Sequence, residues 1–220
     1  MSKTVSVVMC TYNGEKYLRE QLDSIIAQTY PIYEIIIQDD GSTDGTASIV
    51  MQYIENNHNI KFFVNEHNLG FNLNFKSAVM KAKGDFVAIS DQDDIWYPEK
   101  IARQVLCIDD YDICFSLCDA GQSQDNTYVV NYKHGFENIL FHSIAGHLML
   151  IKRQFAQESK NWLSCCCYDW SLALNAQLQN GIVKVEESLN WHRIHSLSAT
   201  HVGKELDVRW KGYELYIYGF

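Results

Sequence analysis

The chain has 220 residues, 47% of them hydrophobic, and a formal net charge of -9, which suits one globular domain with a sizeable core. The acidic balance argues against a nucleic-acid partner, because phosphate contacts need a basic face. No stretch approaches the roughly 18 to 20 apolar residues of a membrane span, and the N-terminus lacks a signal-peptide pattern, so a cytoplasmic protein is predicted.

The first half alternates strand and helix patterns. Four short runs rich in β-branched residues predict buried strands, and each is followed by a polar or glycine-containing loop. The strands are predicted at 5–10, 33–38, 60–64 and 85–89, and the helices at 17–26, 47–54 and 72–82. This order predicts a parallel sheet with right-handed crossovers, whose loops gather at the carboxyl edge, where open α/β sheets bind ligands.

The second half has a less regular pattern. Helices are predicted at 99–107 and 168–179, and strands at 112–117, 128–130, 145–151 and 182–186. This half is therefore expected to be mixed rather than doubly wound. Residues 205–220 are rich in aromatic side chains, and three roles stay open for them: docking on the core, a subunit contact, or the start of a membrane-facing segment.

The most informative stretch is 90–98, where Asp91, Asp93 and Asp94 crowd together after a predicted strand. Like charges this close need a compensating cation or hydrogen-bond donors, and a divalent ion that carries a phosphate group fits such a site. The alternative is an ordinary acidic loop. The seven cysteines show no paired zinc spacing, so reduced thiols are expected.

Four motifs in order carry a family resemblance. Residues 7–14, 38–46, 68–72 and 90–98 together resemble the inverting glycosyltransferases of family 2, and in particular their rhamnosyltransferase-like members. The resemblance implies an α/β GT-A fold, a Rossmann-like and mostly parallel central sheet flanked by helices. It implies one domain over 1–204, with a nucleotide-sugar-binding half at about 1–98 and a mixed acceptor-binding half at about 99–204.

The same resemblance implies roles for residues of the first half. Asp40 matches the carboxylate that reads the uracil or thymine edge, Asp91 contacts the ribose, and Asp93 binds Mg²⁺ or Mn²⁺. An ionised carboxylate suits the imide N–H of a pyrimidine. The other residues expected to bind the nucleotide sugar are Thr11, Tyr12, Asn13, Asp39, Asn68 and Gln92. Ser42, Thr43 and Asp44 are interpreted as turn and cap residues.

The second half is expected to supply the general base. Residues 167–172 resemble the family's late acidic motif, and Asp169 is the candidate that removes the proton of the acceptor hydroxyl. Tyr168 departs from the motif, since an acid or a histidine is frequent at its position. The alternative is that Asp169 merely caps the following helix.

The last motif lies at 186–200. Within it, Arg193 and His195 match the family's basic pair, which implies a diphosphate contact for Arg193 and a metal or phosphate contact for His195. His192 is interpreted as an ordinary residue without a functional role. His147 lies in the predicted strand 145–151, which resembles a segment lining the acceptor side.

These motifs predict transfer of a sugar from a UDP- or dTDP-linked donor, with dTDP-rhamnose as the specific guess. The acceptor would be a hydroxyl of a polysaccharide or of a lipid-linked oligosaccharide. Association with the inner face of the membrane and self-association stay open. Two other hypotheses are a nucleotidyltransferase and a nucleotide-sugar-binding protein without turnover. The first is weakened because residues 11–14 hold one glycine and no adjacent arginine.

Overall fold

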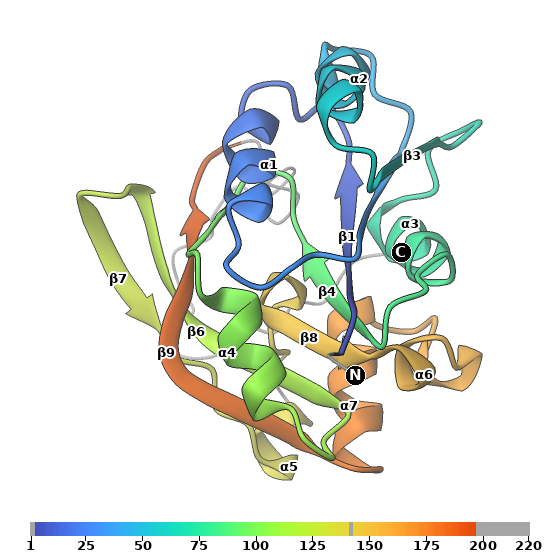
Figure 1. Ribbon diagram of the computed structural model, residues 1–220. Coiled ribbons are helices and arrows are strands. Elements are labelled where there is room, and N and C mark those ends of the chain that lie inside the picture. Colours follow the sequence, from blue (N-terminus) through green and yellow to red (C-terminus); the bar gives the residue numbers. More distant parts are fainter. Residues whose placement is uncertain (1–2, 141–142, 197–220) are drawn as a thin grey trace.

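The computed structural model describes residues 3–140 and 143–196. The first half forms parallel strands β1 (Val5–Thr11), β2 (Glu34–Asp39), β3 (Ile60–Val64) and β4 (Phe86–Ser90), which lie in the order β3-β2-β1-β4 (Figure 1). Helices α1 (Leu18–Ile26), α2 (Thr46–Asn56) and α3 (Phe71–Val79) connect them. The predicted alternation of strands and helices is confirmed here.

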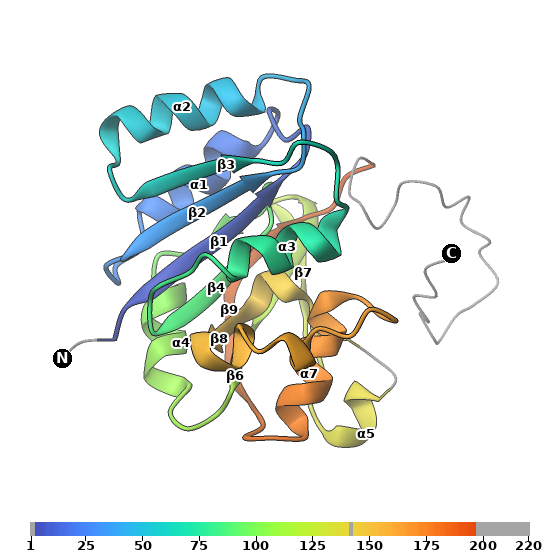
Figure 2. The same ribbon diagram turned by 90° about the vertical axis from the view of Figure 1, so that its right-hand side faces the viewer.

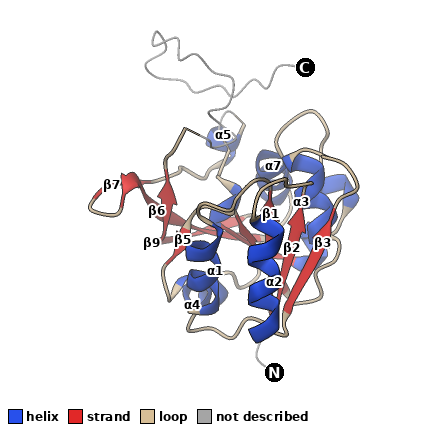
Figure 3. Ribbon diagram, turned by 90° about the horizontal axis from the view of Figure 1, so that it is seen from above, coloured by secondary structure: helices blue, strands red, loops and turns tan. Residues whose placement is uncertain are grey.

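Strands β1, β2 and β4 are buried on both faces because their side chains alternate between two apolar layers, whereas β3 lies at the edge of the sheet and is largely exposed. Val8 and Ile36 pack with α3, whereas Val7, Met9 and Ile35 pack with α1 and α2. Figures 2 and 3 show the sheet between these helices. Such a sheet presents ligand-binding groups only at its edges, in the loops that follow the strands.

The second half is mixed, as predicted. It contains α4 (Lys100–Cys107), β6 (Ile113–Ser123), β7 (Asn126–Val130), α5 (Phe136–Ile139), β8 (Met149–Lys152), α6 (Arg153–Ala156), α7 (Tyr168–Gln177) and β9 (Ile182–Arg193). Strand β8 runs antiparallel to β4 and β6, and β6 runs parallel to β9. One nine-stranded sheet therefore continues from the first half into the second.

Three expected strands differ from the structure. Residues Gly146–Leu148 form a 3₁₀ turn, and β8 begins only at Met149, so the predicted strand 145–151 starts too early. Strand β6 runs to Ser123, beyond the predicted 112–117, and β9 continues well beyond the predicted 182–186. The second part of β9 pairs with the end of β6 and with the short strand β5 (Ile95–Trp96). The pairing with β5 joins residues about a hundred positions apart, which no local pattern reveals.

The end of the chain is only partly described. The last residues of the expected domain, 197–204, and the aromatic segment 205–220 lie outside the described residues. Within the described ranges, none of the helices has the length and apolar character that crossing a membrane requires.

Candidate functional site

Three strand ends bring the predicted site residues to one edge of the sheet. The carboxyl ends of β1, β2 and β4 are neighbours, with Thr11 opposite Asp39 in the parallel register. The Thr11 hydroxyl donates to Asp39 Oδ1 over 2.7 Å. The backbone N–H of Tyr12 donates to Gln92 Oε1 over 2.9 Å, and Gln92 Nε2 donates back to the Tyr12 carbonyl over 3.1 Å. Hydrogen bonds therefore join the loops of the first and fourth motifs.

Asp40 organises the loop before α3. Its carboxylate accepts hydrogen bonds from the N–H groups of Leu69 and Gly70 over 2.8 and 2.9 Å, and Asn68 Nδ2 donates to its carbonyl over 3.1 Å. Asp40 is almost fully buried, and so is Asp39. The structure thus brings Asp39, Asp40 and Asn68 together, and recognition of a pyrimidine by Asp40 stays a prediction.

The interpretation of residues 42–44 as turn and cap residues agrees with their contacts. The Ser42 hydroxyl donates to Asp39 Oδ1 over 2.6 Å and accepts from the N–H of Asn13 over 2.8 Å. The N–H of Thr46 donates to Asp44 Oδ1 over 3.0 Å at the start of α2. The backbone N–H of Thr43 donates to Asn13 Oδ1 over 2.9 Å. The polar groups of residues 42–44 thus hold the loops that carry Asn13 and Asp39 in place.

The acidic stretch after β4 is electrostatically strained. Burial, together with the charges of Asp94 and Asp93, raises the pKa of Asp91 well above its ordinary range. Burial and Asp94 also raise the pKa of Asp93, although its contact with His195 opposes that shift. His195 Nε2 lies 2.8 Å from Asp93 Oδ2. A carboxylate and an imidazole that meet in this way fit a divalent ion, which would also relieve the repulsion among the carboxylates.

Asp94 belongs to a second group of interacting side chains, which is buried. Its two carboxylate oxygens lie 2.6 Å from His147 Nδ1 and 2.8 Å from His192 Nδ1. Burial alone would raise the pKa of Asp94, but the two histidines hold it well below its usual range. Burial opposes protonation of His192, yet Asp94 raises the pKa of His192 to about 9. The three side chains are close enough to bind a metal ion together, with ligand atoms within 4.8 Å of one another.

The buried group contains two histidines that the sequence did not link to Asp94. His192, interpreted from the sequence as an ordinary residue, contacts Asp94 directly, because β9 continues past the acidic loop. His147 lies in the 3₁₀ turn rather than in the predicted strand, which corrects that expectation, and it also contacts Asp94. The Lys100 ammonium joins them, since it donates to the His147 carbonyl over 2.8 Å and to Asn190 Oδ1 over 3.1 Å. No sequence signal links residues this far apart.

Asp169 lies in the first turn of α7 and is partly exposed. Burial raises the pKa of its carboxyl to about 6, although hydrogen bonds from the Trp170 N–H, the Ser143 hydroxyl and the Gly146 N–H act in the opposite direction. The N-cap residue of α7 is Cys167, so Asp169 does not occupy the N-cap position, although its Oδ1 accepts the Trp170 N–H of the first turn over 2.7 Å. A partly exposed carboxylate with a raised pKa is suited to accept a proton.

Arg193 is held by neighbouring side chains. Its guanidinium lies between the rings of Tyr17 and Trp191, 4.3 and 4.5 Å from their centroids, and donates to Glu20 over 2.6 Å. Its Nε donates to the Asp93 carbonyl over 3.0 Å. In this arrangement Arg193 fixes the acidic loop, and its expected contact with a diphosphate oxygen stays a prediction.

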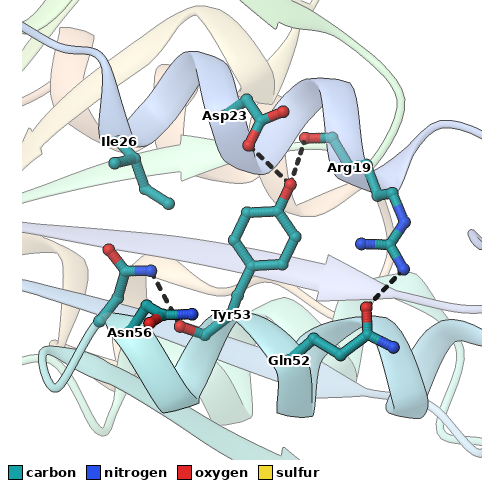
Figure 4. Close-up of a pocket in the computed structure, with 7 residues that line it drawn as sticks. Arg19, Asp23, Ile26, Gln52, Tyr53 and Asn56 are labelled. Atoms are coloured by element: carbon teal, nitrogen blue, oxygen red, sulfur yellow. Dashed lines mark hydrogen bonds between the residues drawn. The ribbon is translucent and has the colours of Figure 1, made fainter.

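A cavity of about 360 Å³ lies elsewhere, between α1 and α2 (Figure 4). Its polar groups contact one another: the Tyr53 hydroxyl donates to Asp23 over 2.6 Å, and Arg19 donates to Gln52 over 2.6 Å. None of the predicted site residues lines this cavity. The candidate site is therefore the edge that carries Asp39, Asp91 and Asp169.

Solved structures with the same fold include glycosyltransferases of the GT-A type. Staphylococcus aureus TarS in complex with UDP-GlcNAc matches with a TM-score of 0.75 and 23% identity, over 87% of this chain and 59% of that one. The mannosyltransferase PcManGT of Pyrobaculum calidifontis, in complex with GDP-Man and Mn²⁺, matches with a TM-score of 0.71 and 20% identity, over 90% and 59%. These similarities confirm the expected GT-A fold.

The sequence comparisons give the family. A Bacillus subtilis protein named "Putative teichuronic acid biosynthesis glycosyltransferase TuaG" is 32% identical over 138 residues, 62% of this chain and 55% of its own length. EpsE of the same organism, also named as a glycosyltransferase, is 38% identical over 102 residues, 46% and 37%. The chain thus spans about half or less of the length of these relatives. The sequence model of glycosyl transferase family 2 matches residues 6–172, and the chain belongs to this family.

Proposed function

We propose that the chain is an inverting, metal-dependent glycosyltransferase that uses a nucleotide-sugar donor and Asp169 as its general base. The observation that carries the proposal is the meeting of the two halves at one site. The pKa of Asp91, from the loop after β4, is raised mainly by burial, Asp94 and Asp93, and the charge of Asp169, from α7, adds to this rise. This contribution supports a base close to the candidate donor loop.

The donor would lie across the ends of β1, β2 and β4. Thr11, Tyr12 and Asn13 would line the base and ribose, and the Tyr12 ring, 52% exposed, is free to stack on a base. Asp39, Asp40 and Asn68 would bound the base, with Asp40 accepting the imide N–H. Asp91 and Gln92 would hold the ribose side, and Arg193 would approach the diphosphate.

The chemistry needs a base and a stabilised leaving group. Ionised Asp169 would take the proton of an acceptor hydroxyl as that oxygen attacks the anomeric carbon from the face opposite the nucleoside diphosphate. A Mg²⁺ or Mn²⁺ ion held by Asp93 and His195 would offset the charge on the departing diphosphate. The product would carry the inverted anomeric configuration, because a single displacement occurs.

The finer assignments rest on the motifs. We propose UDP or dTDP as the donor nucleotide, with dTDP-rhamnose as the first donor to test. The acceptor would be a polysaccharide or lipid-linked oligosaccharide hydroxyl, in the cytoplasm at the inner face of the membrane. TuaG is named for teichuronic acid biosynthesis, which supports a surface-glycan acceptor. The proposed domain covers 1–204, with 1–98 for the donor and 99–204 for the acceptor.

A thermal-shift panel tests the donor site. UDP-, dTDP- and GDP-linked sugars are added with Mn²⁺, with Mg²⁺ or with a chelator, to the wild type and to Asp93→Asn. A UDP or dTDP donor at 100 times its Kd should stabilise the wild type by about 2.7 kcal/mol. The stabilisation should depend on the ion and should be strongly reduced in Asp93→Asn. Absence of any response to all donors in the wild type would count decisively against the proposal.

A further inference from the structure

The first N–H group of helix α7 is bound by a side chain from another part of the chain, whereas the Trp170 N–H donates locally to Asp169 Oδ1 over 2.7 Å. The N-cap residue, Cys167, makes no side-chain hydrogen bond to the first turn. The free N–H groups at the start of a helix need acceptors, which a side chain near the N-cap usually provides. Here the acceptor comes from α3, because the N–H of Tyr168 donates to Asn72 Oδ1 over 2.8 Å.

Asn72 also contacts the turn before α7. Its Nδ2 donates to the carbonyl of Cys166 over 3.4 Å, so one amide side chain bonds to both sides of Cys167. The two contacts span 94 and 96 positions along the sequence. They join the second residue of α3, in the donor half, to the residue that immediately precedes Asp169.

Asn72 lies two residues after a contact of the donor site. The N-cap residue of α3 is Gly70, whose N–H donates to Asp40 Oδ2 over 2.9 Å. Asp40 also accepts from the Leu69 N–H. Hydrogen bonds thus fix the backbone before α3 to Asp40, and two residues further along the backbone the Asn72 side chain bonds to the turn that precedes Asp169.

The opposite side of that turn is tightly packed. The Tyr168 side chain is buried and its ring lies 4.5 Å from the ring of Phe75, another residue of α3. A side chain at Gly146 would overlap the Tyr168 hydroxyl. The Tyr168 side chain is thus packed between α3 and the 3₁₀ turn, and its backbone N–H is bound by Asn72. These contacts together restrict movement of the backbone next to Asp169.

We propose that Asn72 is a positioning residue for the general base: it fixes the start of α7 relative to the donor site and so places the Asp169 carboxylate. The inference rests on the proposed function of Asp169 and adds a residue that touches neither donor nor acceptor. It also assigns a role to the last residue of the motif at 68–72. Misplacement of a reacting group by about 1 Å can cost roughly a hundredfold in rate.

Steady-state kinetics of Asn72→Ala and Asn72→Asp test this role. Asn72→Ala removes the acceptor for the Tyr168 N–H, and we expect kcat to fall about 10- to 100-fold while the KM for the donor changes less than about threefold. Asn72→Asp keeps the acceptor for the Tyr168 N–H but loses the donor to the Cys166 carbonyl, so its kcat should lie between those of Asn72→Ala and the wild type. A merely structural role would lower the amount of folded protein in both variants without this split between kcat and KM.

Asn175→Ala is the control, because Asn175 lies on α7, the helix that Asn72 contacts, and its Nδ2 donates to the Ser171 carbonyl within that helix. It should leave kcat unchanged. Donor-induced thermal shifts of Asn72→Ala should equal those of the wild type, which shows that the donor site is intact. A kcat within twofold of wild type in Asn72→Ala overturns the inference, and so does equal loss in Asn72→Asp and Asn72→Ala.

Asp169→Asn separates this inference from the proposed function. If Asp169→Asn retains transfer, the assignment of the base is wrong, and the role of Asn72 fails with it. If Asp169→Asn loses transfer while Asn72→Ala retains it, the base stands and only the positioning role is wrong. Loss in both, with donor binding kept in both, supports the two proposals together.

Discussion

Two carboxylates of this chain have opposite electrostatic environments. Asp169 is partly buried with hydrogen bonds as its only strong compensation, and its pKa rises to about 6. Asp94 is fully buried between two histidines, and its pKa lies well below the usual range. Groups whose pKa values are pushed apart in this way take different roles: the first can exchange a proton near neutral pH, and the second is a permanent charge.

The raised pKa of Asp169 gives the direction of the pH dependence. A general base works only when it is ionised, so kcat should rise with pH, reach half of its plateau at about pH 6, and stay high up to about pH 8. A pH series of initial rates at saturating donor, acceptor and Mn²⁺ measures this. A profile that is flat between pH 5 and 8 would contradict Asp169 as the base.

Asp169→Asn should separate activity from stability. Transfer should fall by about 10² to 10⁴-fold, the usual contribution of a general base. Because the folded-state pKa is raised, ionisation of Asp169 costs stability as pH rises through about 6, and this cost is absent below the unfolded value near 3.9.

The melting temperature of Asp169→Asn relative to wild type should therefore increase from pH 5 to pH 8. Differential scanning fluorimetry at both pH values checks this shift. Asp125→Asn, at an exposed turn, is the control that should show no such trend. A relative melting temperature that falls with pH would show that the carboxylate is stabilised in its ionised form.

At the scale of elements, the sequence pattern predicted the strands whose residues are themselves strand-forming. Strands such as β1 and β2 are uninterrupted apolar runs, and the polar loops after them could be placed at one edge of the sheet from topology alone. Strand β5 and the second part of β9 were not predicted, since β5 forms by pairing with β9, and the second part of β9 pairs with both β5 and β6. The 3₁₀ turn at Gly146–Leu148 was likewise missed, because a short apolar segment is equally typical of a strand.

The start of α3 depends on a backbone conformation that favours glycine. Gly70 has φ 75° and ψ 157°, which other residues rarely adopt, and a Cβ added at this position would have no neighbouring atom within 4 Å. Gly70→Ala should therefore cost about 1 to 3 kcal/mol through backbone strain rather than through a clash. Urea denaturation measures the loss, and nucleotide-sugar affinity should fall with it, because the Gly70 N–H contacts Asp40.

Gly135→Ala provides the comparison for this effect. Gly135 also precedes a helix, but its φ of -138° is open to any residue, and an added Cβ would meet only Asn138 at an ordinary 3.5 Å. The free energy of unfolding of Gly135→Ala should lie within about 0.5 kcal/mol of wild type, as for most surface substitutions. Equal losses in the two variants would rule out backbone conformation as the cause at Gly70.

At the scale of the whole molecule, the two halves meet through buried polar groups as well as through the shared sheet. Asp94 follows the last strand of the donor half, whereas His147, Asn190 and His192 belong to the second half. The sequence identified Asp94 as part of an acidic motif, but its partners lie far along the chain and carry no motif that names them. The site residues that share one loop were thus predicted from the sequence. The partners of Asp94 were missed, because they come close to it only in the folded chain.

This network predicts a large loss of stability for Asp94→Asn. Four donors face the carboxylate, from His147, His192, Asn190 and the Arg193 N–H, and an asparagine offers one acceptor oxygen and adds donors of its own. The buried Lys100 and His192 would lose the negative charge that balances them, whereas burial lowers the pKa of His147. Breaking a buried charge pair in this way typically costs about 3 to 5 kcal/mol.

Urea denaturation of Asp94→Asn and of the exposed control Asp125→Asn measures the difference in free energy of unfolding. The slope against urea should match that of wild type, because the same surface is exposed on unfolding. Lys100→Met should partly restore the stability of Asp94→Asn, since it removes an unbalanced buried charge, and this coupling separates electrostatics from packing. A loss below about 1 kcal/mol in Asp94→Asn would contradict the prediction, and it would mean that the sheet and its apolar layers alone hold the two halves together.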